Sequence, residues 1–183
     1  GPTRCLASAL LLSTLWEHMF VLGIDPGLST LGYGLLESRG HKTRAVAAGV
    51  IRTDPSHDIG HRLAELYTDL DDLLREHKPD AAAIEQVFVN RNLQTATAVG
   101  RASGVVLLAL AQHKVPVTEY SPSAVKRALT GYGNADKLQM KKVVAMRLGL
   151  DEPPSPADAA DALAIALCHI QGASLRRLVE GVS

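Results

Sequence analysis

Three short apolar segments near the start of the chain predict three β-strands. The segments run from Phe20 to Ile24, from Leu31 to Glu37 and from Thr43 to Ile51, and glycine-bearing turns separate them. Strands that are joined by short turns pair in antiparallel fashion. We therefore expect residues 20–51 to form an antiparallel meander.

Apolar positions further along the chain predict helices that alternate with two more strands. Leucine or isoleucine recurs with the period of a helix at positions 59, 63, 66, 70 and 73. Short strands are expected at residues 80–85 and 115–117, and helices at residues 93–112, 122–129, 136–148 and 156–171. The helix at 93–112 is apolar nearly all round, so we expect it to be covered on more than one side.

This order of elements predicts an α/β fold. A helix between two strands of one sheet forms a crossover that lays the second strand parallel to the first. The expected architecture is a mixed five-stranded sheet, three antiparallel strands followed by parallel strands, flanked by helices.

The length fits one domain with a segment outside it at each end. We interpret residues 1–19 as a tag or upstream extension, residues 20–172 as the domain and residues 173–183 as a C-terminal tail. The apolar stretch from Cys5 to Trp16 is too short to span a bilayer, so no membrane contact is expected. Cys168 is the one cysteine inside the domain, which excludes a disulfide framework and favours a reducing cytoplasm.

Charge is unevenly distributed although the chain as a whole is neutral. Residues 86–147 carry nine Lys or Arg against two acids, a net charge of +7, and the rest of the chain carries −7. Such asymmetry is typical of a protein with one face toward a polyanion, although solvated helix faces would also produce it.

Four acidic residues occupy positions from which they can meet. Asp25 and Glu85 each end an apolar strand, where open α/β sheets gather their ligands. Asp158 and Asp161 are three residues apart and share one face of an alanine-rich helix. We expect Ser155 to cap this helix and Pro156 to begin it, which would also explain Asp158 as part of a capping box. Asp161 has no such explanation.

Four carboxylates without a Cys or His cluster form an all-oxygen site, which suits Mg²⁺ or Mn²⁺. Two such ions would support hydrolysis of a phosphodiester, one activating water and the other stabilising the leaving oxygen. We assign Asp25, Glu85, Asp158 and Asp161 as catalytic metal ligands. The histidines at positions 57, 61, 77 and 113 are interpreted as surface helix residues and assigned to no metal.

Four motifs in order resemble those of RuvC-type Holliday junction resolvases, members of the ribonuclease H-like superfamily. They are "GIDPGLSTLGYGLL", "AIEQVFVNRNLQTATAVGRASG", "VKRALTGYGNADKLQM" and "PADAADALAIA", and the match runs from about Phe20 to Gly172. The resemblance implies a homodimeric, Mg²⁺-dependent endonuclease that makes two symmetric nicks in four-way DNA. It also implies delivery of the junction by a branch-migration complex of the RuvA and RuvB type.

The resemblance further implies DNA-binding residues. Phe88 matches an aromatic that stacks on bases at the crossover, and Lys126 and Lys137 match lysines that face the DNA backbone. Arg91 and Asn92 are weaker candidates for reading the junction. Ser103 departs from the pattern, because the family places a basic residue there.

Two other functions fit parts of the sequence. A junction-binding protein of the same fold would lack nuclease activity, but all four acids are present. An actin-like or sugar-kinase-like ATP-binding domain also opens with an Asp and a glycine-rich hairpin, but such proteins need a second lobe for which this chain is too short.

Overall fold

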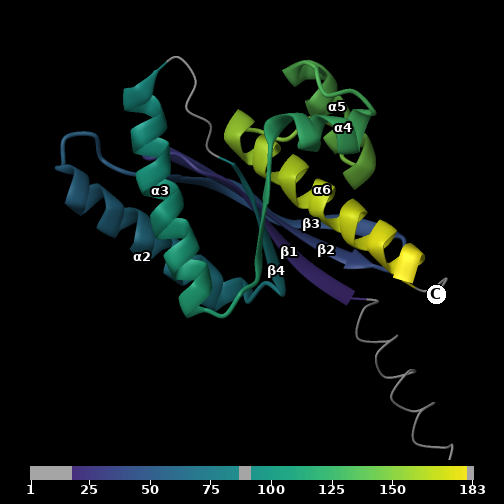
Figure 1. Ribbon diagram of the computed structural model, residues 1–183, viewed down its shortest axis with the longest axis horizontal. Coiled ribbons are helices and arrows are strands. Elements are labelled where there is room, and N and C mark those ends of the chain that lie inside the picture. The colour runs from purple at the N-terminus through teal and green to yellow at the C-terminus, as the bar shows by residue number, and fades with distance from the viewer. Residues whose placement is uncertain (1–17, 87–91, 181–183) are drawn as a thin grey trace, which may run out of the picture.

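The computed structural model describes residues 18–86 and 92–180. It contains five strands and five helices within those residues (Figure 1). Their bounds are β1 His18–Asp25, β2 Thr30–Arg39, β3 Lys42–Arg52, α2 Ile59–His77, β4 Ala81–Glu85, α3 Leu93–Gln112, β5 Val117–Tyr120, α4 Pro122–Thr130, α5 Lys137–Leu148 and α6 Ala157–Glu180.

The strands form one mixed sheet in the order β3-β2-β1-β4-β5. β1 pairs antiparallel with β2, and β2 with β3, while β4 lies parallel to both β1 and β5. The predicted architecture is therefore confirmed. The central position of β1 gives it neighbours on both sides, and its carboxyl end lies beside that of β4.

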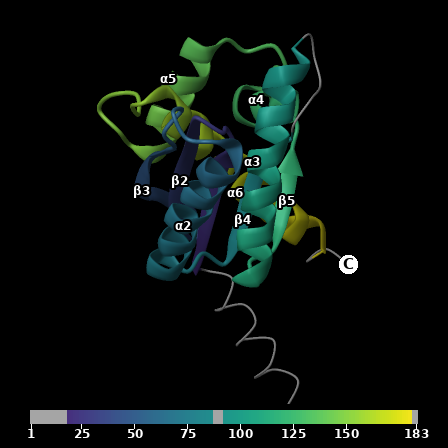
Figure 2. The same cartoon turned by 90° about the vertical axis from the view of Figure 1, so that its left-hand side faces the viewer.

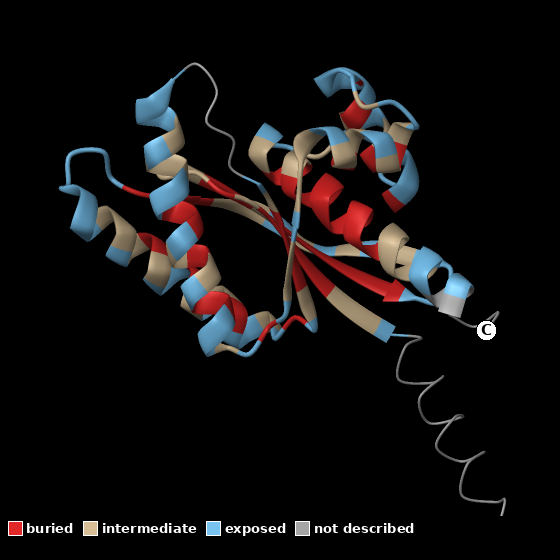
Figure 3. Cartoon of the chain, in the orientation of Figure 1, coloured by how far each residue is buried: buried red, intermediate tan, exposed pale blue. Residues whose placement is uncertain are grey.

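Helices cover both faces of the sheet, α2 and α3 on one and α4, α5 and α6 on the other (Figures 1 and 2). Alternate residues of β1 enter the two cores: Leu22 and Ile24 pack with α2 and α3, whereas Val21 packs with α6. Buried residues follow the strands and the inner face of α6 (Figure 3). α6 lies across β1, β2 and β3, which explains why this helix is alanine-rich.

Several boundaries differ from expectation; β5, for example, spans Val117–Tyr120 instead of residues 115–117. β1 begins at His18, and its first residues join the fold: the Nε2 atom of His18 lies 2.5 Å from Oε1 of the buried Glu37. α6 continues to Glu180 instead of ending near residue 171. One interior glycine, Gly172, costs such a helix only about 1 kcal/mol, which is too little to end it.

α3 is covered on one side only, contrary to expectation. Its buried residues form one stripe that includes Ala102, Val106 and Leu110, while Leu93 and Leu108 are exposed. By length and hydropathy α3 would suit a membrane span, but core helices of other proteins meet the same criterion. Its inner stripe packs against the sheet and α2.

Candidate active site

Two of the four predicted acids lie at the carboxyl ends of neighbouring parallel strands. Ile24 of β1 is paired with Ile84 of β4, so the residues that follow, Asp25 and Glu85, end these strands side by side. Alternation along the strands directs both carboxylates to the face that α6 covers, since Ala83 packs with that helix. The sheet register therefore brings together two acids that are 60 residues apart in sequence.

The other two acids come from the first turns of α6. The helix begins at Ala157, where the Pro156 carbonyl accepts hydrogen bonds from the amides of Ala159 and Ala160. The prediction that Pro156 is the first helical residue was therefore wrong by one position. Asp158 is the second helical residue, not the third, so it does not occupy the position that a capping box requires.

Glycines in β1 and β2 allow α6 to approach the sheet closely. A Cβ atom at Gly32 would lie 2.1 Å from the Asp158 carbonyl oxygen, and one at Gly23 would lie 2.0 Å from that of Ala162. The small alanine side chains of α6 allow this approach from the side of the helix. The glycines are equally necessary, because any side chain at these strand positions would push the helix away from Asp25.

The resulting cluster places Asp25, Asp158 and Asp161 together. One carboxylate oxygen from each lies within 4.8 Å of the others, and all three side chains are half-buried. Burial, followed by the charges of Glu85, Asp161 and Asp158, raises the pKa of Asp25 to about 7 from its ordinary 3.8. Burial and the Asp161 charge also raise the pKa of Glu85, which belongs to the same electrostatic group.

Three lysines oppose this negative charge. Burial raises the pKa values of Asp25, Glu85 and Asp161, and the charge of Lys137 at the start of α5 partly offsets this rise in all three. Lys126 of α4 acts on Glu85 and Lys141 acts on Asp161. Lys126 and Lys137 were sequence candidates, but Lys141 was missed. Its spacing of four residues from Lys137 put both on one helix face and was the available signal.

The remaining DNA-binding candidates are only partly placed. Phe88 and Arg91 lie outside the described residues. Asn92 is the N-cap of α3, where its side chain accepts a hydrogen bond from the Thr95 amide at 3.1 Å. Ser103 is buried on the inner stripe of α3, and among the described residues its hydroxyl has no hydrogen-bond partner. This position therefore faces the core and not a DNA strand.

The donor set determines what the cluster can hold. Carboxylate oxygens are ligands for hard cations such as Mg²⁺, Mn²⁺ or Ca²⁺. Burial raises the pKa of Asp25 most, and repulsion by the neighbouring acids raises it further. A bound cation would relieve that repulsion, so the residues fit a metal site.

The sequence of this chain matches a known protein family. The family described as "Crossover junction endodeoxyribonuclease RuvC" matches residues 21–169. The chain belongs to the RuvC family. RuvC from Moorella thermoacetica is 46% identical over 165 residues, which cover 90% of this chain and 99% of that protein. RuvC from Chloroflexus aggregans is 50% identical over 151 residues, covering 82% and 92% respectively.

A solved RuvC structure agrees with the fold. T. thermophilus RuvC in complex with a Holliday junction substrate superposes with a TM-score of 0.82 at 40% sequence identity, covering 86% of this chain and 96% of that one. The ribonuclease H-like assignment of the sheet and the resemblance to RuvC are thus confirmed.

Proposed function

We propose that this RuvC-family protein is a structure-selective endonuclease that resolves four-way DNA junctions by paired symmetric nicks during recombination and repair. The observation that carries the proposal is the convergence of Asp25, Asp158 and Asp161 within 4.8 Å at the end of the central strand. The family match and the junction-bound structure of T. thermophilus RuvC support the same substrate class.

We infer that Asp25, Asp158 and Asp161 are metal ligands and that Glu85 orients or bridges them. The site would take two hard cations, Mg²⁺ with Mn²⁺ as a substitute, which when bound activate water and stabilise the leaving oxygen of a phosphodiester. The carboxylates come from a strand end and a buried helix, so their positions are fixed before the ions bind.

The lysines provide the positive charge that a DNA backbone requires. Lys137 is exposed, whereas Lys126 and Lys141 are half-buried, and all three act on the acidic cluster electrostatically. We propose that they hold the scissile phosphate near the carboxylates and that Phe88, Arg91 and Asn92 contact the opened junction. Phosphate contacts give affinity that falls with salt but little sequence preference.

A second subunit would supply the second nick. A four-way junction is nearly two-fold symmetric, and a dimer with the same symmetry presents two sites to it. The exposed apolar side chains of α3, Leu93 and Leu108, are candidates for the subunit contact. We further propose a cytoplasmic location, where the DNA lies, and delivery of the junction by a RuvA and RuvB type complex.

The other functions considered from the sequence have less support. A non-catalytic junction-binding protein would not need the four acids that we propose as metal ligands. An ATP-binding domain of the actin or sugar-kinase type is not favoured by a family match that spans residues 21–169.

Cleavage of a synthetic junction tests the proposal. We expect labelled four-way DNA, but not linear duplex with the same arms, to be nicked symmetrically in Mg²⁺ or Mn²⁺ and not in EDTA. Glu85→Gln should abolish nicking while the junction still binds. Glu76→Gln, a matched change at an exposed residue of α2, should cleave as the wild type does. Junction binding without cleavage by the wild type in either metal would favour the non-catalytic alternative.

Sedimentation tests the dimer. We expect a dimer at micromolar concentration and a shift toward monomer in Leu108→Ser. A wild type that is monomeric both free and on the junction would contradict the proposed assembly.

A further inference from the structure

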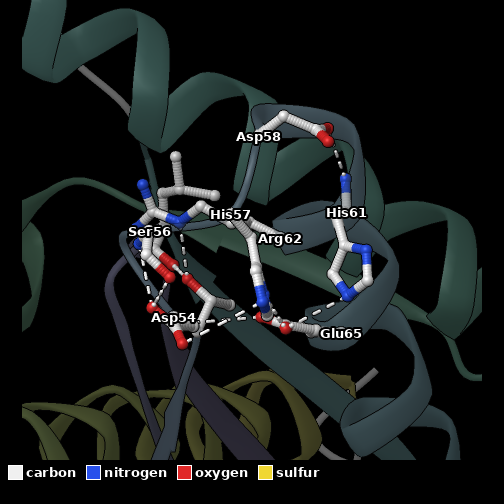
Figure 4. Close-up of polar contacts among 9 residues, drawn as sticks. Asp54, Ser56, His57, Asp58, His61, Arg62 and Glu65 are labelled. Carbon is white, nitrogen blue, oxygen red and sulfur yellow. Dashed lines mark hydrogen bonds and ion pairs between the residues drawn. The ribbon is translucent and has the colours of Figure 1, made fainter.

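A second group of metal-ligating side chains lies outside the acidic site, where the loop after β3 leads into α2. His57 belongs to the loop, and His61 and Glu65 lie one turn apart on the helix. One ligand atom from each lies within 4.8 Å of the others. In Figure 4 the dashed lines that mark polar contacts of His57 and His61 meet at the Glu65 carboxylate.

The distances in this group suit a single ion. Nδ1 of His57 lies 2.6 Å from Oε1 of Glu65, and Nε2 of His61 lies 3.4 Å from the same oxygen. Around a tetrahedral ion with bonds of about 2.1 Å, ligand atoms are about 3.4 Å apart. His61 already has this spacing to Glu65. His57 is hydrogen-bonded to the same oxygen, so its ring would have to move away from Glu65 when an ion takes the place of the shared proton.

Neighbouring groups hold the ligands in place. The Asp54 amide donates a hydrogen bond to Oε2 of Glu65 at 3.1 Å, which leaves Oε1 toward the histidines. Nε2 of His57, the ring nitrogen turned away from Glu65, lies 4.0 Å from the Asp54 carboxylate. That separation is too long for a hydrogen bond, so Asp54 would have to move closer to orient the ring as carboxylates commonly do for metal-binding histidines. Asp58 caps α2 by accepting from the His61 amide at 3.0 Å, which fixes the first helical turn.

We propose that His57, His61 and Glu65 bind one divalent transition-metal ion of the Zn²⁺ class. Two imidazoles and one carboxylate favour such borderline ions over the hard cations of the acidic cluster. His57 and His61 are exposed, with 42% and 58% of their side-chain surface accessible, so the ion enters directly from solvent and keeps water at its open positions.

The site is connected to the turn that follows Asp25. Arg62, one residue after His61, donates to the Ser29 hydroxyl at 2.8 Å and to the Thr53 hydroxyl at 3.0 Å. Thr53 in turn donates to the Leu28 carbonyl at 2.8 Å. An ion that joins the loop to α2 therefore stabilises the segment against which this turn packs, and bound Zn²⁺ is expected to raise the melting temperature.

Calorimetric titration of Zn²⁺ into the full chain tests the proposal, with Mg²⁺ in excess to occupy the acidic cluster. We expect the wild type to bind one more equivalent than His61→Ala, with affinity at least about tenfold lower in His57→Ala and Glu65→Gln. The Zn²⁺-dependent rise in melting temperature should disappear in the same variants. His41→Ala, which removes an exposed histidine between β2 and β3, is the matched control and should bind as the wild type does.

Equal stoichiometry and affinity in the wild type and His61→Ala would overturn the proposal, as would absence of Zn²⁺ binding. An equal loss in His41→Ala would show nonspecific binding to surface histidines and would also overturn it. The two sites share no residue, so either result leaves the proposed nuclease function to be judged by junction cleavage alone.

Discussion

The electrostatic cost of the acidic cluster predicts that replacing Asp25 by Asn stabilises the metal-free protein. In the unfolded chain Asp25 ionises near pH 3.8, whereas in the fold its pKa is about 7. Between these values the folded state binds more protons than the unfolded state, so stability falls as the pH rises. An asparagine has almost the same size and carries no charge, so Asp25→Asn avoids this loss.

The magnitude follows from the shift. One pKa unit corresponds to about 1.4 kcal/mol, so the rise from 3.8 to about 7 lowers the free energy of unfolding by about 4 kcal/mol at pH 8 and by about 2 kcal/mol at pH 5. Asp25→Asn should therefore have a larger free energy of unfolding than the wild type by up to about these amounts, with the advantage growing by about 2 kcal/mol from pH 5 to pH 8.

Urea denaturation in EDTA at the two pH values measures this difference. Asp72→Asn, at an exposed residue of α2 on the opposite side of the sheet, is the matched control and should show no such pH dependence. Adding Mg²⁺ should stabilise the wild type and not Asp25→Asn, because only the wild type retains the Asp25 carboxylate that would bind the ion. An Asp25→Asn protein that is less stable than the wild type at pH 8, or equally more stable at both pH values, would refute the reasoning.

Three further changes test other parts of the structure. Gly32→Ala should push α6 away from Asp25, since the new Cβ would lie 2.1 Å from the Asp158 carbonyl oxygen, and should lower the cleavage rate by about 100-fold. Gly100→Ala is the control: its Cβ would have no atom within 4 Å, so the cleavage rate should not change. Lys137→Ala removes a charge that lowers three carboxylate pKa values, so the acidic limb of the cleavage pH profile should move to higher pH, and an identical profile would contradict this role. The His18 hydrogen bond is the chief cause that lowers the pKa of Glu37 to about 2, so the ionised Glu37 stabilises the fold above pH 4.5 and loses this effect as the pH falls toward 2. Glu37→Gln should therefore lower the melting temperature more at pH 7 than at pH 3. Equal losses at the two pH values would argue against a stabilising contact between His18 and Glu37.

Local sequence patterns were sufficient to predict the strands and helices and to single out the acidic candidates. The apolar period of each segment predicted the five strands and the helices with boundary differences of at most three residues, apart from the end of α6, which lies at Glu180 instead of residue 171. Asp25 and Glu85 could be recognised because each ends an apolar strand, and Asp161 because an aspartate is unusual inside an alanine-rich helix. These signals depend on residues that are close together in the chain, so they can be read without knowledge of the fold.

Other features depend on distant contacts. Lys141 belongs to the site only because α5 packs against α6, which brings its charge near Asp161. His57 and His61 were interpreted from the sequence as surface helix residues and assigned to no metal, and Glu65 was not considered with them, although His57 in fact precedes the first residue of α2. Their convergence depends on how the loop after β3 enters α2, which the periodicity of α2 alone does not determine.

The sequence by itself determined the order of elements and the family and proposed the four carboxylates as metal ligands, because periodicity and motifs are read from residues close in the chain. Only the tertiary structure decided that Gly23 and Gly32 admit α6 so closely, that Asp158 lies outside a capping box and that the pKa of Asp25 is raised. Each of these depends on the distance between segments that are far apart in the chain, and packing and electrostatic repulsion act through that distance.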